Sequence, residues 1–152
     1  IKVNNETSYE DIPKLWVKFR TDLCNEAAIE DGSRTIPMVV KSCRIGEFAI
    51  CMDEGIGSKE FSYMIAGKYD GGEIPEGLVV CEIPAAEWAK FRCVGPMPGA
   101  LQVVNTKIFK EWLPGNPDYE LAMGIDVEWY SGSNTSDVNY QSEIWVPVKR
   151  KW

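Results

Sequence analysis

A carboxylate between aromatic residues stands near the C-terminal end of the chain, in GIDVEWYSG (124–132). Alternate residues of a strand point to opposite faces, so Ile125, Val127 and Trp129 share one face, and Asp126, Glu128 and Tyr130 share the other. Glu128 then has two interpretations, a solvated outer-face residue or part of a pocket floor that holds a cation. A carboxylate among aromatic rings suits a lipophilic cation, because the rings make cation–π contacts and the carboxylate supplies the counter-charge.

The composition of the chain excludes several kinds of catalytic and metal-binding site. The chain has no histidine, which excludes Ser-His-Asp and Cys-His catalysis as well as His-ligated zinc or haem, and we expect neither a metal nor a cofactor. Acid–base chemistry would fall to carboxylates, Lys, Tyr or Cys. The five cysteines are odd in number and form no CxxC pair, which is typical of reduced, buried thiols in a cytoplasmic protein.

The charge of the chain argues against nucleic-acid binding. Lys and Arg number 16 against 23 Asp and Glu, a formal charge of −7, and no basic patch with interleaved aromatics occurs. An acidic surface attracts cations weakly, although the same charge also serves solubility. No apolar run approaches the roughly 18 residues of a membrane span, so we expect no membrane association.

Hydrophobic spacing predicts two amphipathic helices, one over about 9–27 and one over about 98–113. The opening IKVNN reads as the end of a strand. The other strand candidates are 47–53, 61–69, 78–84, 87–95, 121–131 and 138–149. The turn-rich DGGEIPEG (70–77) divides the chain near its centre.

These elements give the order strand, helix, strand, strand twice over. We therefore expect one domain over 1–152 with pseudo-repeats at about 1–70 and 71–152. Two helices among many strands predict an α+β fold, an antiparallel sheet with both helices on one side. The other side of that sheet would be left as a platform or a concave groove for a ligand.

Five phrases support a family assignment, because they occur together in one order. They are IPKLWVKF, EIPAAEWAKFRCVGP, IFKEWLPG, DVEWY and SEIWVPVK. In this the chain resembles the GyrI-like effector-binding domains, small-molecule modules of AraC-type and multidrug-sensing MerR-type regulators that also occur as stand-alone proteins. The resemblance implies a tandem βαββ fold whose concave side binds cationic, aromatic or lipophilic compounds. It also implies an acidic site residue at Glu128 and a second glutamate at Glu143.

The candidate ligand-binding residues combine this resemblance with strand facing. If Val127 and Trp129 pack beneath the helices, Glu128 points into the concave side. The candidates are Glu128, Glu143, Trp88, Trp145, Tyr63, Phe48 and Tyr130. Lys90 and Arg92 share a face with Trp88 and could neutralise either glutamate. In the core we expect Trp16, Trp112 and Trp129, together with Ile144, Val146 and Val148.

Binding without chemistry is the expected function, in effector sensing for transcription regulation or in a stand-alone protein. Two alternatives stay open: a glutamate-dependent hydrolase of reactive cyclopropane-type compounds, and an interaction protein of the gyrase-inhibitor kind. The chain begins at Ile1 with no helix-turn-helix before it, so a DNA-binding domain was either removed or never present. A homodimer is compatible with such a domain, but the sequence does not choose the oligomeric state.

Overall fold

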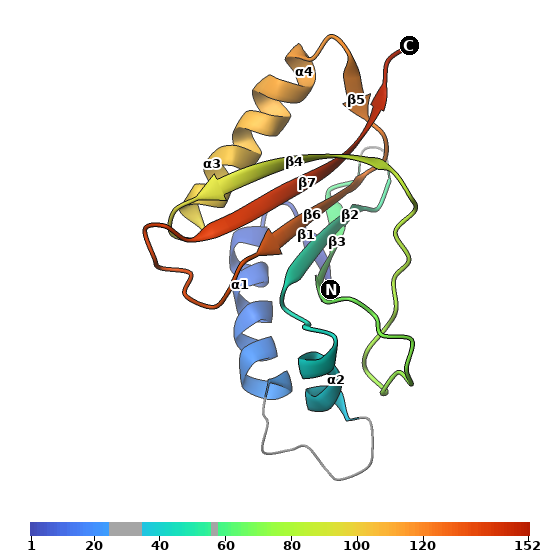
Figure 1. Cartoon of the computed structure of the whole chain (residues 1–152), viewed down its shortest axis with the longest axis vertical. Coiled ribbons are helices and arrows are strands. Elements are labelled where there is room, and N and C mark those ends of the chain that lie inside the picture. Colours follow the sequence, from blue (N-terminus) through green and yellow to red (C-terminus); the bar gives the residue numbers. More distant parts are fainter. Residues whose placement is uncertain (25–34, 56–57) are drawn as a thin grey trace.

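A single antiparallel sheet of seven strands organises the molecule (Figure 1). The structure is a computed structural model that describes residues 1–24, 35–55 and 58–152. Its strands are β1 (Lys2–Asn4), β2 (Phe48–Asp53), β3 (Glu60–Ala66), β4 (Glu87–Val94), β5 (Tyr119–Leu121), β6 (Ile125–Tyr130) and β7 (Gln141–Arg150). They run in the order β1-β3-β2-β6-β7-β4, with β5 paired to the end of β7.

The sheet order contains two similar halves. The first half is β1-β3-β2 and the second is β6-β7-β4, so the first strand of each half lies toward an edge and β2 meets β6 in the middle. Each half also sends a helix between its first strand and its hairpin. This is the α+β tandem βαββ architecture that the sequence predicts.

The two predicted helices are present, although each is interrupted. Helix α1 (Ser8–Lys18) continues as a π-helical segment (Phe19–Leu23), and residues 25–27 of the expected helix lie outside the described part of the chain. Helix α3 (Gly99–Lys107) continues through a π-helical segment (Ile108–Trp112) into the short α4 (Leu113–Gly115). Helix α2 (Ile36–Ser42) was not predicted from the sequence. None of the helices in the described ranges has the length and apolarity to cross a membrane.

Both long helices cover the same face of the sheet, which we call the helix face. Ala49, Glu128 and Ile144 stand directly opposite one another on β2, β6 and β7, so their side chains share one face. Ala49 belongs to the core cluster under α1, whereas Ile144 belongs to the cluster under α3 and its continuation. Figure 1 shows α1 and α3 on one side of the strands, with the chain between β3 and β4 on the other.

The prediction of a strand at 78–84 is wrong. The segment joining β3 to β4 forms no strand, and Val79 and Val80 in its apolar run are 75% and 48% exposed. Ile83 packs instead against the sheet face opposite the helices, and the Cys81 thiol lies 3.8 Å from the Met52 sulfur. The segment thus contacts the sheet through side chains.

The single strand predicted at 121–131 is present as two strands, β5 and β6.

Candidate ligand-binding site

Strand β6 faces the opposite way from the expectation. Val127 and Trp129 do not pack beneath the helices, because they lie with Phe48 and Ile50 on the other face of the sheet. Glu128 therefore points to the helix face. The alternation in DVEWY correctly separated the two sets of side chains, but alternation alone carries no information about which set the helices cover.

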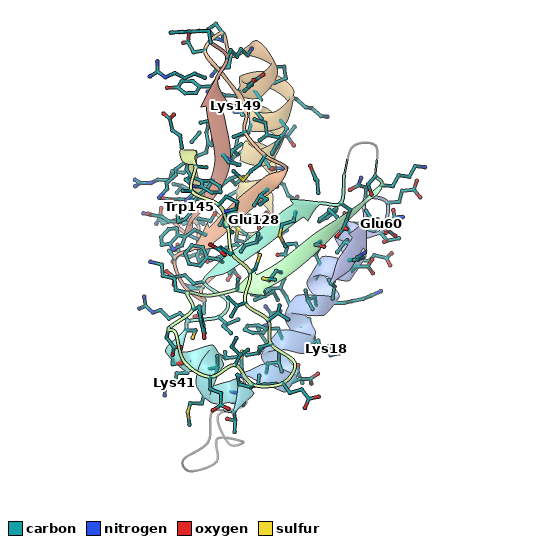
Figure 2. All side chains as sticks on the ribbon, turned by 90° about the vertical axis from the view of Figure 1, so that its right-hand side faces the viewer. Lys18, Lys41, Glu60, Glu128, Trp145 and Lys149 are labelled. Atoms are coloured by element: carbon teal, nitrogen blue, oxygen red, sulfur yellow. The ribbon has the colours of Figure 1, made fainter. Side chains whose placement is uncertain are left out.

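The seven candidate site residues consequently fall into two groups. Glu128, Tyr130 and Tyr63 lie on the helix face. Glu143, Trp145, Trp88 and Phe48 lie on the opposite face, as the pairing of Trp129 with both Phe48 and Glu143 shows. The expectation that Glu143 and Trp145 face the same way as Glu128 is wrong, because Glu128 pairs directly with Ile144. Figure 2 shows Glu128 and Trp145 near the middle of the sheet, on neighbouring strands.

A chain of hydrogen bonds on the helix face leads to the Glu128 carboxylate. The Trp16 indole Nε1 donates to the Tyr63 hydroxyl at 2.9 Å, the Tyr63 and Tyr130 hydroxyls are hydrogen-bonded, and the Tyr130 hydroxyl donates to Glu128 Oε2. The Trp16 and Tyr130 rings also meet edge to face, 5.6 Å between centroids. We call Trp16, Tyr63, Glu128 and Tyr130 the Glu128 cluster. Tyr130 is its centre, since it packs against the core clusters under both helices.

The carboxyl groups of this region are held in an environment that disfavours their charge. Burial raises the pKa of Glu128, and the hydrogen bond from Tyr130 opposes that rise only in part. Burial, together with the charges of Glu128 and Asp53, raises the pKa of Asp126 to about 7. Burial and the Glu128 charge also raise the pKa of the Tyr63 and Tyr130 hydroxyls. Within the described residues, no Lys or Arg forms an ion pair with Glu128 or Asp126.

The opposite face of the sheet also combines aromatic rings with carboxylates, and we call it the tryptophan face. It consists of Phe48, Trp88, Trp129 and Trp145 with the charged residues Glu47, Lys90 and Glu143. Trp129 Nε1 donates to Glu47 at 3.2 Å, and Trp145 Nε1 donates to Glu143 at 2.7 Å. The Lys90 ammonium lies 3.9 Å from the Trp145 ring centroid, a cation–π geometry. This face already contains its own cation.

Two surface hollows of the described part of the chain lie away from the Glu128 cluster. One surface hollow is formed by the loop 131–141, and a second lies between the N-terminus and α1, where Lys2, Lys14 and Lys18 line it. Neither includes Glu128. No group of three or more potential metal ligands was found in the part of the chain that the structure describes. The helix face is thus the place where an uncompensated carboxylate meets aromatic rings.

Two residues of this region were not predicted as site residues. Trp16 packs against the core cluster under α1, as expected, and its indole N–H also joins the Glu128 cluster, a contact that helical spacing could not show. Asp126 was placed on the same strand face as Glu128 but was not proposed as a site residue. A signal was available, since an aspartate in the interior of a hydrophobic strand is unusual.

Comparison with known proteins gives a consistent assignment. The chain has the fold of SAV2435, whose solved structure contains tetraphenylphosphonium: the TM-score is 0.70 at 18% identity, covering 98% of this chain and 86% of that one. A bacterial transcription regulation protein from Staphylococcus aureus MU50 gives a TM-score of 0.66 at 20% identity, covering 98% and 89%. A search of curated proteins found no match. The model of the integron-associated effector-binding protein Cass2 matches residues 1–148, and the chain therefore belongs to this GyrI-like, effector-binding family.

Proposed function

We propose that this chain binds lipophilic aromatic cations on the helix face, with Glu128 as the counter-charge. The observation that carries the proposal is a half-buried carboxyl group among aromatic side chains, with no cation from the described residues beside it. A partly buried negative charge without a cation beside it is costly. A bound cation would remove that cost. The Glu128 carboxylate would therefore favour cations over neutral molecules.

The aromatic side chains suit the organic part of such a ligand. Trp16 and Tyr130 offer ring surfaces beside the carboxylate, and Tyr63 holds both through its hydroxyl. These two rings meet edge to face, so a ligand that lay between them would separate them. The fold neighbour SAV2435 was solved with tetraphenylphosphonium, an aromatic lipophilic cation, which supports the same class of ligand here.

The biological role that fits this binding is effector sensing without chemistry, in a transcription regulator or in a stand-alone binding protein. The family description and the regulator-like fold neighbour support it. The link between the site and helix α1 also supports it, because the hydrogen bond from Trp16 ties this helix to the Glu128 cluster. A ligand that displaced Trp16 would alter the packing of α1 on the sheet.

Tetraphenylphosphonium is the appropriate first probe. We expect it to quench the tryptophan fluorescence of the wild-type chain, since Trp16 lies in the cluster. Glu128→Gln keeps the size of the side chain and removes its charge, so the affinity should fall about ten- to a hundredfold, equivalent to about 1–3 kcal/mol. The thermal midpoint should stay the same or rise, because the ligand-free protein no longer holds a partly buried charge without a cation beside it.

Glu143→Gln is the matched control for this experiment. It removes a carboxylate from the adjacent strand, but on the tryptophan face, where Trp145 already donates to it. Cation affinity should therefore change less than twofold. Equal losses in both variants would indicate long-range charge alone, and an unaffected Glu128→Gln would place the ligand elsewhere. Water addition to cyclopropane electrophiles that Glu128→Gln abolishes would instead favour the hydrolase alternative.

A further inference from the structure

Trp16 is joined to Glu128 through two tyrosine hydroxyls. Its indole Nε1 lies 2.9 Å from the Tyr63 hydroxyl, which is hydrogen-bonded to the Tyr130 hydroxyl, and the latter reaches the carboxylate. Three elements contribute to this series: α1 carries Trp16, β3 carries Tyr63, and β6 carries Tyr130 and Glu128. One continuous set of hydrogen bonds therefore runs from a helix to a carboxylate on the sheet.

The donors in this series all point toward the carboxylate. An indole N–H can only donate, an ionised carboxylate can only accept, and a tyrosine hydroxyl has a single proton. The Tyr130 proton goes to Glu128, so the Tyr63 proton goes to Tyr130, and the Trp16 proton goes to Tyr63. Tyr63 is only 3% exposed, and a buried hydroxyl proton needs an acceptor. The two ends thus fix the direction of the whole series.

The other indoles in the described part of the chain lack this arrangement. Trp129 and Trp145 donate directly to carboxylates of the tryptophan face. Trp112, at the end of the π-helical segment after α3, packs edge to face on Phe91, with 4.9 Å between ring centroids. It belongs to the core cluster under α3, and packing accounts for its position. Trp16 combines packing under its own helix with donation toward a site residue.

We infer that Trp16 and Tyr63 are positioning residues for Glu128, because their donors orient the Tyr130 hydroxyl toward the carboxylate and so favour its charged form. The inference rests on the proposed function, in which the charge of Glu128 holds the ligand. Hydrogen bonds to an ionised acceptor are about twice as strong as those between neutral groups, and bonds in series strengthen one another. The position of α1 thereby influences the charge of a residue on the sheet.

The titration of Glu128 should report this influence. Burial raises the pKa of Glu128, and the hydrogen bond from Tyr130 opposes the rise. The other titratable groups around it are Asp126 and Tyr130 on β6, Cys51 and Asp53 on β2, Tyr63 on β3 and Cys93 on β4. Within the described ranges, no Lys or Arg forms an ion pair with Glu128. Removing a donor from the series should therefore raise its pKa further.

Carbon-13 NMR of the glutamate carboxyl groups measures this effect on the ligand-free chain, with the Glu128 signal identified by its absence from Glu128→Gln. Tyr63→Phe should raise the titration midpoint of Glu128 by about 0.2–0.5 pH unit, less than the loss of a direct hydrogen bond would. Trp16→Phe keeps an aromatic ring but removes the N–H, and it should give a smaller shift in the same direction. Trp112→Phe is the matched control and should leave the midpoint at its wild-type value.

A second readout needs no change to the series. In proton–nitrogen NMR of the wild-type chain, the Trp16 Nε1–H signal should move with pH at the midpoint of the Glu128 carboxyl signal. This movement should vanish in Glu128→Gln, and the Trp112 signal should not show it. A role of Trp16 in packing alone would not produce this dependence. The readout therefore decides the matter even if Trp16→Phe fails to fold.

The outcomes separate this inference from the function on which it rests. A Trp16 signal that ignores the titration of Glu128, or a midpoint that Tyr63→Phe leaves unchanged, would overturn the positioning role even if tetraphenylphosphonium binds through Glu128. If tetraphenylphosphonium does not bind, or binds Glu128→Gln as tightly as wild type, the proposed function fails whatever the NMR midpoints are. If both hold, the pH midpoint of tetraphenylphosphonium binding should rise in Tyr63→Phe together with the NMR midpoint.

Discussion

Both faces of the sheet place carboxylates beside aromatic rings, but only the tryptophan face also has a cation of its own. The tryptophan face joins Trp129 to Glu47 and Trp145 to Glu143 through indole N–H donors, and Lys90 supplies a cation over Trp145. The helix face also places aromatic rings beside carboxylates. There, however, the described residues bring no cation to Glu128 or Asp126.

This difference shows why composition alone does not identify a binding site. Aromatic rings and a glutamate within one strand pair describe both faces equally well. A face whose carboxylates already have donors, and whose ring already has an ammonium group, gains little from a cationic ligand. A face whose carboxylates have no cation beside them gains more, because the ligand removes a penalty that the folded protein already carries.

The largest expected effect is on stability as a function of pH. Burial and the charges of Glu128 and Asp53 raise the pKa of Asp126 from its ordinary value of 3.8 to about 7, so the folded state binds more protons than the unfolded state between about pH 4 and pH 7. The free energy of unfolding should therefore fall as pH rises through this range and then level off. Asp126→Asn removes the loss, and at pH 8 it should be more stable than wild type by about 1–3 kcal/mol.

Urea denaturation at pH 4.5 and pH 8 measures this difference. The advantage of Asp126→Asn should be small at pH 4.5, where the wild-type carboxyl group is protonated in the folded state. Asp118→Asn changes an exposed aspartate and should shift the free energy of unfolding by less than about 0.5 kcal/mol at both pH values. A variant that is equally or less stable than wild type at pH 8 would mean that Asp126 has a partner.

A smaller effect is expected from the donor that the helix face does possess. Tyr130→Phe removes the hydrogen bond that opposes the rise in the pKa of Glu128, so this pKa should rise further. The midpoint of the pH dependence of cation binding should move upward, and affinity near pH 7 should fall by about 0.5–1.5 kcal/mol. Tetraphenylphosphonium titrations over a pH series measure both quantities.

Tyr140→Phe is the control for a lost tyrosine hydroxyl. Tyr140 is buried and donates to the carbonyl oxygen of Gly132 at 2.7 Å, away from the Glu128 cluster. Tyr140→Phe should lose about as much stability as Tyr130→Phe, because each variant loses a tyrosine hydroxyl that donates a hydrogen bond. It should not move the pH midpoint of cation binding. The same midpoint shift in both variants would show that Tyr130 acts through general stability and not through Glu128.

The contrast between the faces also explains how far the sequence could lead. The alternation in DVEWY assigned Glu128 and Trp129 to opposite faces, and the recurrence of strand, helix, strand, strand predicted the tandem architecture that the structure confirms. These properties follow from local periodicity. Which face the helices cover depends on contacts between distant elements, such as Ala49 with the α1 cluster and Ile144 with the α3 cluster.

The site composition was predictable only in part for the same reason. Glu128, Tyr130 and Tyr63 were predicted and do lie together, but Trp88, Trp145, Phe48 and Glu143 were grouped with them although they occupy the other face. Trp16 joins the cluster from a helix that precedes Glu128 by more than a hundred residues along the chain. The apolar run at 78–84 was predicted as a strand because of its hydrophobicity. Hydrophobicity does not reveal whether a neighbouring strand is available for pairing, and the run forms no strand.

The smallest expected effect comes from the cation of the tryptophan face. Lys90→Met keeps an unbranched side chain over Trp145 but removes the ammonium group, and a cation–π contact at an exposed position contributes only about 0.5–1 kcal/mol. We expect a loss of stability of that size in urea denaturation, whereas Lys90→Arg should retain most of it. Tetraphenylphosphonium should bind Lys90→Met as it binds wild type, because Glu128 faces the helices. A gain in affinity in Lys90→Met that Lys90→Arg does not share would show that the ligand competes with Lys90 for Trp145, which would move the site to the tryptophan face.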